Sequence, residues 1–108
     1  MNAYEELLKF LQPNEKVSYI VFGAWGWDGY EESNPPSVPE DKRGVMLTLE
    51  EAKPYMQDWQ FDGGFGAPFC YAVHVWTNER VIFVSEYDGS THLNSVPRNP
   101  TAEEPRMT

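Results

Sequence analysis

The chain has 108 residues, of which 41% are hydrophobic and 15% aromatic, and its formal net charge is −9. This length fits one small domain with enough apolar material for a core. Nucleic-acid-binding proteins and proteins that dock on anionic membranes normally carry basic patches, so the acidic balance argues against both classes. Cys70 is the only cysteine, which excludes an internal disulfide and a cysteine-based zinc site.

Targeting signals are not evident in the sequence. The first six residues are acidic, rather than basic followed by apolar, so they do not resemble a signal peptide. No apolar run approaches the roughly 20 residues that a membrane-spanning helix needs. We therefore expect a cytoplasmic protein that does not bind membranes.

The first predicted element is a helix over residues 2–12. Its apolar residues recur at the spacing of one helix face: Tyr4, Leu7, Leu8 and Leu11. Asn2 and Glu5 fit a capping box at the start, and Pro13 ends the helix.

A strand is predicted over residues 16–24. Apolar side chains occur on both of its faces, which is typical of a strand that is central or covered on both sides. Further on, residues 31–44 contain three prolines and two acidic pairs, so we expect a long loop without regular structure there.

A second helix is expected over roughly residues 49–59. Thr48 and Glu51 fit a capping box at its start. Pro54 lies at the sixth helical position, so the helix either kinks or restarts near this residue. The apolar face would come from Tyr55, Met56 and Trp59.

The sequence of the last third of the chain predicts three strands, at residues 69–77, 80–87 and 91–96. Together the elements predict an α+β fold: an antiparallel sheet of about four strands, in the order α-β-long loop-α-β-β-β, with one or two helices packed on one face. We expect residues 1–96 to form a single domain and residues 97–108, which contain three prolines, to be a flexible tail.

Aromatic residues precede Asp-Gly three times, at Trp27-Asp28-Gly29, Phe61-Asp62-Gly63 and Tyr87-Asp88-Gly89. Asp-Gly is a turn signal, so ordinary turns beside core aromatics are the simplest interpretation. The alternative is that three acidic loops meet at one binding surface. The three carboxylates lack the spacing of known metal-binding motifs, and we expect no metal.

The candidate binding residues combine aromatic side chains with carboxylates. Trp25 and Trp27 are two residues apart, so in an extended segment they share one face. They are either core residues or interface anchors, because tryptophan is common in both places. The full set of candidates is Trp25, Trp27, Asp28, Tyr30, Glu31, Glu32, Glu40, Asp41, Asp62 and Asp88.

Catalytic residues do not form a recognisable pattern. Cys70 and His74 are four residues apart on one predicted strand, about 13 Å, which is too far for a histidine to activate the thiol. The other histidine, His92, need not approach either of them. We expect no enzyme activity and no cofactor.

The favoured function is a non-enzymatic module that binds a basic protein through its acidic N-terminal half, as an inhibitor of a nucleic-acid-handling protein. In composition alone, the chain resembles small acidic inhibitors such as immunity proteins and phage-encoded DNA mimics. The alternative is a small-ligand or carbohydrate-binding domain that uses the aromatic loop. A small hydrolase and a homodimer that buries surplus aromatic side chains stay open.

Overall fold

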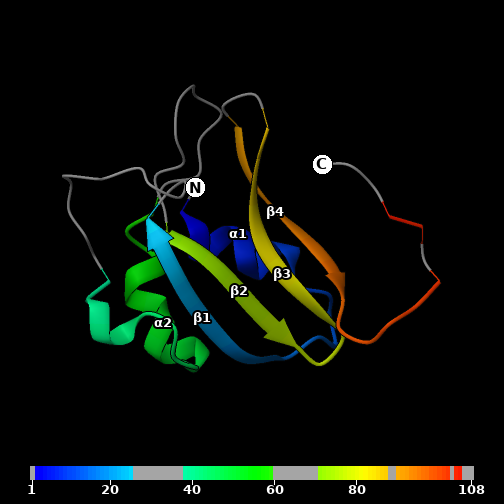
Figure 1. The fold of residues 1–108 in the computed structure, drawn as a ribbon, viewed down its shortest axis with the longest axis horizontal. Coiled ribbons are helices and arrows are strands. Elements are labelled where there is room, and N and C mark those ends of the chain that lie inside the picture. The colour runs from blue at the N-terminus through cyan, green and yellow to red at the C-terminus, as the bar shows by residue number, and fades with distance from the viewer. Residues whose placement is uncertain (1, 26–37, 60–70, 88–89, 103, 106–108) are drawn as a thin grey trace.

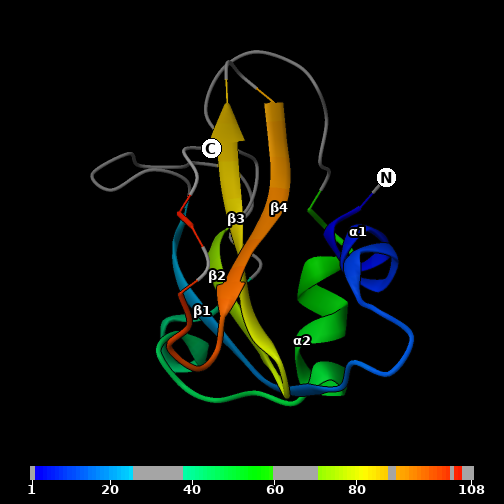
Figure 2. The same ribbon diagram turned by 90° about the vertical axis from the view of Figure 1, so that its right-hand side faces the viewer.

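The computed structural model describes residues 2–25, 38–59, 71–87, 90–102 and 104–105. Its elements follow in the order α1 (Ala3–Phe10), β1 (Val17–Trp25), η1 (Glu40–Lys42), α2 (Leu49–Met56), β2 (Tyr71–Thr77), β3 (Arg80–Tyr87) and β4 (Ser90–Pro97). The strands form one antiparallel sheet in the order β1-β2-β3-β4. Both helices lie on one face of it (Figure 1, Figure 2). The predicted α+β fold is confirmed.

Both helices begin at the predicted capping boxes. Asn2 Oδ1 accepts a hydrogen bond from Glu5 N–H at 2.8 Å, and Glu5 Oε1 accepts one from Asn2 N–H at 3.1 Å. Thr48 and Glu51 make the same reciprocal pair at 3.1 and 2.9 Å. The prediction for Leu8 is wrong, because this side chain is 47% exposed. Only a narrow stripe of the short α1 helix faces the core.

The helix α2 continues through Pro54, so of the two predicted alternatives, a kink or a restart at this residue, the restart is wrong. Ala52 N–H donates to Thr48 O and Gln57 N–H donates to Lys53 O, each at 3.0 Å. Helical hydrogen bonds therefore exist on both sides of the proline. The helix ends at Met56, three residues earlier than predicted.

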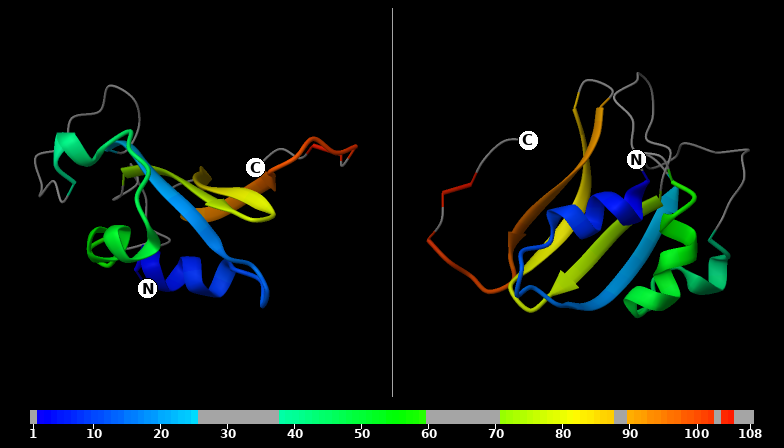
Figure 3. Two further views of the ribbon diagram at one scale, coloured as in Figure 1. Left: turned by 90° about the horizontal axis from the view of Figure 1, so that it is seen from below. Right: turned by 180° about the vertical axis from the view of Figure 1, so that it is seen from behind.

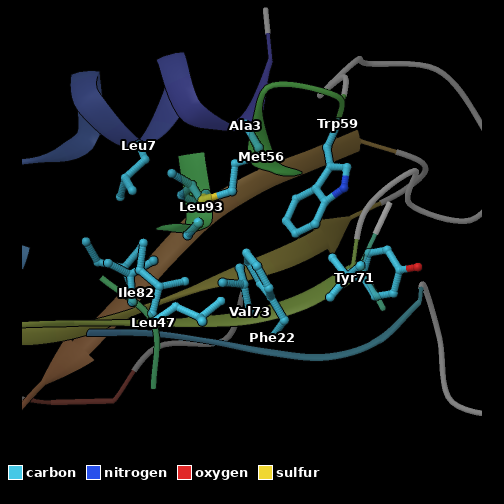
Figure 4. Close-up of a cluster of buried hydrophobic side chains, with 14 residues drawn as sticks. Ala3, Leu7, Phe22, Leu47, Met56, Trp59, Tyr71, Val73, Ile82 and Leu93 are labelled. Atoms are coloured by element: carbon cyan, nitrogen blue, oxygen red, sulfur yellow. The ribbon is translucent and has the colours of Figure 1, made fainter. Parts of the chain in front are cut away.

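The core lies between the sheet and the two helices (Figure 4). Its aromatic part is built on Trp59, whose ring centroid is 5.1 Å from that of Phe22 and 5.6 Å from that of Tyr71. Trp59 O also accepts a hydrogen bond from Ala3 N–H at 2.8 Å, which joins the start of α1 to the end of α2. The remaining buried apolar residues are Ala3, Leu7, Ile20, Val38, Leu47, Ala52, Met56, Val73, Val75, Ile82 and Leu93.

β1 is an edge strand, so the prediction of a central strand is wrong. Its outer edge is instead covered by residues 43–47. Ile20 and Leu47 exchange backbone hydrogen bonds of 2.7 and 2.8 Å, and Gly44 N–H donates to Phe22 O at 2.9 Å. Gly44 has a φ of 68°, a left-handed conformation that glycine adopts without steric cost.

A buried ion pair closes one end of the core. Glu15 Oε2 lies 2.7 Å from Arg80 Nε, and Glu15 Oε1 lies 2.8 Å from Arg80 Nη2. Thr77 Oγ1 donates to the same carboxylate at 2.6 Å, and Arg80 Nη2 also donates to Phe10 O. The hydrogen bonds from Arg80 lower the pKa of Glu15 to about 2.

Candidate functional site

The predicted binding residues are only partly within the described structure. Glu40 and Asp41 are the two whose side chains it describes. For Trp25 it describes the backbone, which pairs with Tyr71 at the end of β1. The others lie outside the described residues: Trp27, Asp28, Tyr30, Glu31, Glu32, Asp62 and Asp88.

Glu40 and Asp41 form the start of η1, a 3₁₀ turn inside the predicted irregular loop 31–44. The expectation of no regular structure is therefore wrong for this turn. Lys42 N–H donates to Pro39 O at 2.9 Å, and this hydrogen bond stabilises the turn. Pro39 also restricts the backbone at the start of the turn, because the proline ring fixes its own φ. Both acidic side chains are exposed.

From η1 the chain passes around the outer edge of β1 to the start of α2. Figure 3 shows η1 on the helix-free side of the sheet and α2 on the other side, with the connecting segment between them. The bonds of Ile20 to Leu47 and of Phe22 to Gly44 attach this segment to β1. Its position is therefore set by the sheet.

Two apolar side chains are exposed in the middle of this segment. Val45 is 40% exposed and Met46 is 68% exposed, whereas the next residue, Leu47, is buried. The backbone bonds of Leu47 hold both of them outward on an ordered segment. Exposed methionine is common on protein-binding surfaces because its unbranched thioether adapts to a partner.

A second acidic pair, Glu50 and Glu51, follows in the first turn of α2 and is exposed. Hydrogen bonds from the Thr48 backbone and hydroxyl lower the pKa of Glu51, and the charge of Lys42 lowers it further. Lys42 of η1 therefore lies close enough to Glu51 at the start of α2 for their charges to interact. We call Glu40, Asp41, Val45, Met46, Glu50 and Glu51 the acidic edge surface.

Arg43 lies beside this surface but directs its charge inward. Its Nη2 donates to Val38 O at 3.2 Å, and its guanidinium carbon lies 5.1 Å from the centre of the Tyr71 ring. Its Nε is buried and makes no hydrogen bond. Arg43 therefore anchors the segment to the core, and its charge is not directed at the outward-facing carboxylates.

The carboxylates of the acidic edge surface form no ion pair within 4.0 Å with another described residue. Among the residues that the structure describes, Glu15 and Arg80 form the one ion pair with an N to O distance within 4.0 Å. Four of the exposed carboxylates without such a pair belong to the acidic edge surface. The sequence pointed to Glu40 and Asp41 but missed Glu50 and Glu51, although two acidic pairs flanking a short apolar run were a usable signal.

Among the described residues, neither α1 nor α2 covers the other face of the sheet, although η1 lies on that side (Figure 2, Figure 3). Strand register and burial assign twelve described positions to this helix-free face: Tyr19, Val21, Gly23, Ala72, His74, Trp76, Val81, Phe83, Ser85, His92, Asn94 and Val96. None of these is Asp, Glu, Lys or Arg. Tyr19 is 46% exposed and Val96 is 50% exposed.

A groove of about 460 Å³ lies at the β4 end of the helix-free face. Phe83, Asn94 and Val96 line its sheet side, and the opposite wall comes from Pro97, Asn99, Pro100, Thr101, Glu104 and Pro105. Arg98 fixes the start of that wall, because its N–H donates to Glu79 O at 3.0 Å and its Nη1 donates to Thr77 O at 2.8 Å.

The histidines form cross-strand and ring contacts. His92 Nε2 lies 3.0 Å from Ser85 Oγ, directly across the β3–β4 pair, and the His74 ring packs edge-on against Trp76. Cys70 lies outside the described residues. In the described part of the chain, no three His, Cys, Asp or Glu residues are grouped so as to hold a metal ion.

No helix among the described residues combines the length and apolarity needed to cross a bilayer. Comparisons with protein-family models, with curated proteins and with solved structures find no match.

Proposed function

We propose that this chain is a non-enzymatic, cytoplasmic protein-binding domain whose acidic edge surface engages a basic partner protein. The observation that carries the proposal is the exposure of Val45 and Met46, at 40% and 68%, on an ordered segment between two acidic pairs. Protein interfaces commonly have this anatomy, with apolar contacts at the centre and charged groups at the rim.

Charge gives this surface its preference for a basic partner. Asp and Glu outnumber Lys and Arg by 17 to 8, and the nearby Arg43 is turned into the core. Long-range attraction raises the association rate of a basic protein and repels acidic ones. A protein that handles nucleic acid carries the required basic surface, so an inhibitor of such a protein is the specific form of the proposal.

The backbone of the segment supports tight binding. Ile20, Phe22 and the 43–47 segment are joined by hydrogen bonds of 2.7 to 2.9 Å, so little ordering is left to occur on binding. A preorganised segment loses less conformational entropy when it docks than a mobile loop does. Met46 is then the expected anchor, with the carboxylates around it.

The test is an affinity capture of partners from the native host's lysate at low salt, followed by elution with a salt gradient. We expect one basic protein to be retained and to elute at moderate salt, because screening weakens exposed charge pairs. With the captured protein, Glu40→Gln combined with Asp41→Asn should weaken binding at least tenfold. Met46→Ser should do the same by removing the apolar anchor.

Matched variants separate local contacts from overall charge. Asp58→Asn combined with Glu79→Gln changes the net charge equally at exposed positions outside the acidic edge surface. Leu8→Ser removes an exposed apolar side chain from α1, outside the acidic edge surface. Equal weakening by these controls, or binding that does not depend on salt, would contradict the proposal. A tryptophan fluorescence response to sugars without any protein partner would favour the small-ligand alternative.

A further inference from the structure

Two methionines of the described structure lie in opposite environments. Met46 is 68% exposed in the middle of the acidic edge surface, whereas Met56 at the end of α2 is fully buried in the core (Figure 4). Met1 and Met107 lie outside the described residues. An oxidant must reach the thioether sulfur to react with it, so exposure governs the rate of methionine oxidation. The fold therefore leaves one of these two thioethers reachable and protects the other.

The backbone on both sides of Met46 is attached to β1. Leu47 and Ile20 exchange backbone hydrogen bonds of 2.7 and 2.8 Å, and Gly44 N–H donates to Phe22 O at 2.9 Å. These bonds join backbone atoms and do not involve the Met46 side chain. A chemical change at its sulfur therefore alters the surface without removing the contacts that hold the segment.

We propose that Met46 is a site of reversible oxidation, at which hydrogen peroxide makes the centre of the acidic edge surface polar while the fold stays intact. The O–O bond of the peroxide breaks, one oxygen bonds to Met46 Sδ, and the other leaves as water with both protons. The sulfide loses two electrons as it becomes a sulfoxide, and the peroxide gains them. Because hydrogen peroxide is uncharged at neutral pH, the carboxylates around Met46 do not repel it.

The exposure of Met46 also makes the oxidation reversible. Methionine sulfoxide reductases, one type for each sulfoxide epimer, must reach the sulfoxide group to reduce it. Two thiols of the reductase supply the two electrons and become a disulfide, and the sulfoxide oxygen leaves as water. A sulfoxide at Met46 faces solvent, where both types reach it. A sulfoxide at Met56 would place a polar oxygen among the apolar side chains of the core, which costs free energy.

Oxidation of Met46 has a consequence for partner binding, and this consequence rests on the proposed function. Met46 is the expected apolar anchor of the acidic edge surface. A sulfoxide oxygen is hydrated in water, so burying it against a partner costs free energy that burying a thioether does not. The neighbouring carboxylates do not offset this cost, because they accept hydrogen bonds and the sulfoxide oxygen requires a donor. We expect the oxidised chain to bind its basic partner at least tenfold more weakly.

The test is treatment of the full chain with hydrogen peroxide, followed by peptide mass spectrometry of each methionine. In the folded chain we expect Met46 to gain one oxygen at least tenfold faster than Met56, and in concentrated urea both should react at the same rate. Circular dichroism should not change, the two reductase types together should remove the oxygen, and the oxidised chain should elute earlier from a hydrophobic-interaction column. Equal rates in the folded chain, unfolding on oxidation of Met46, or an oxygen that the reductases leave in place would overturn the proposal.

The matched control is Met46→Leu, which keeps an apolar side chain of similar volume and leaves every other methionine in place. Peroxide should change the column retention of this variant less than that of the wild type. An equal change would assign the effect to another methionine and overturn the proposal.

The basic protein captured from the lysate gives a second measurement. Peroxide should weaken its binding to the wild type and leave its binding to the Met46→Leu variant unchanged. If the untreated chain captures no protein, the proposed function fails, while mass spectrometry still decides the oxidation site. If the captured protein binds the chain equally well after complete oxidation of Met46, the effect on binding is refuted and the proposed function stands.

Discussion

Glu15 is the described residue whose charge is most closely tied to the fold. Its carboxylate accepts hydrogen bonds from Arg80, from Thr77 and from Gln12 N–H, and its side chain is fully buried. Arg80 also lies over the Phe10 ring, with its guanidinium carbon 4.5 Å from the ring centre. Removing either charge leaves the other buried without a counter-charge, which is the costly outcome for a buried ion pair.

We therefore expect Glu15→Gln to lower the free energy of unfolding by about 3 kcal/mol. Arg80→Met should cost a similar amount, because it leaves the Glu15 carboxylate unpaired. Urea denaturation measures both changes. Glu79→Gln, an exposed carboxylate next to Arg80 in sequence, is the control and should change stability by less than about 0.5 kcal/mol. Equal effects of the Glu15 and Glu79 variants would refute a structural role for the ion pair.

The lowered pKa of the Glu15 carboxylate predicts that the stability of the fold depends on pH. Arg80 holds the pKa of Glu15 at about 2 in the folded chain, below its ordinary 4.5. The unfolded chain therefore takes up the proton first as the pH falls. The stabilising contribution is complete above pH 4.5 and is lost between pH 4.5 and about 2. In urea denaturation across this window, Glu15→Gln should show a shallower decline than the wild type, and an unchanged slope would contradict the assignment.

At the scale of the elements, Pro54 lowers the stability of the helix α2. Pro54 provides no N–H for the carbonyl of Glu50, and its ring crowds the preceding turn. Because Pro54 is exposed, Pro54→Ala should raise the free energy of unfolding by about 1–3 kcal/mol. Thermal and urea denaturation test this, with Gln57→Ala beyond the end of the helix as the control. A loss of stability would show that the proline is required by its packing.

Local sequence patterns predicted where the helices begin better than they predicted how the elements pair and pack in the fold. The capping boxes at Asn2 and Thr48 depend on residues three positions apart, so they can be recognised in the sequence. The edge position of β1 follows from its pairing with β2 alone, across the long connection from Trp25 to Tyr71, and no local pattern encodes that pairing. The continuation of α2 through Pro54 likewise depends on packing that overrides local preference.

The candidate site was predictable to a similar extent. Charge composition pointed to Glu40 and Asp41, because acidic pairs are visible in the sequence. Val45 and Met46 were missed, since apolar residues are expected to be buried. Their exposure follows from the backbone bonds of Leu47 to β1, which is a tertiary effect.

For the whole molecule, the charge of −9 on a chain with a radius of gyration of 13.6 Å implies mutual repulsion in the folded state. Raising NaCl from about 10 to 300 mM should therefore raise the melting temperature by a few degrees, because the screening length becomes shorter than the molecule. Differential scanning calorimetry measures this rise. Asp58→Asn combined with Glu79→Gln should show a smaller rise, and a fall in the wild type would mean that attractive charge pairs dominate.

Sequential strand order sets the route by which the chain folds. β2, β3 and β4 are consecutive both in the chain and in the sheet, so each pairing closes only a short turn. β1 reaches β2 only after the long connection from Trp25 to Tyr71, and that closure costs more chain entropy. The three C-terminal strands should thus form the folding nucleus, with Ile82→Val showing a φ-value near one and Ile20→Val a value near zero in stopped-flow kinetics. The N-terminal half, with its acidic edge surface, then joins a sheet that already exists.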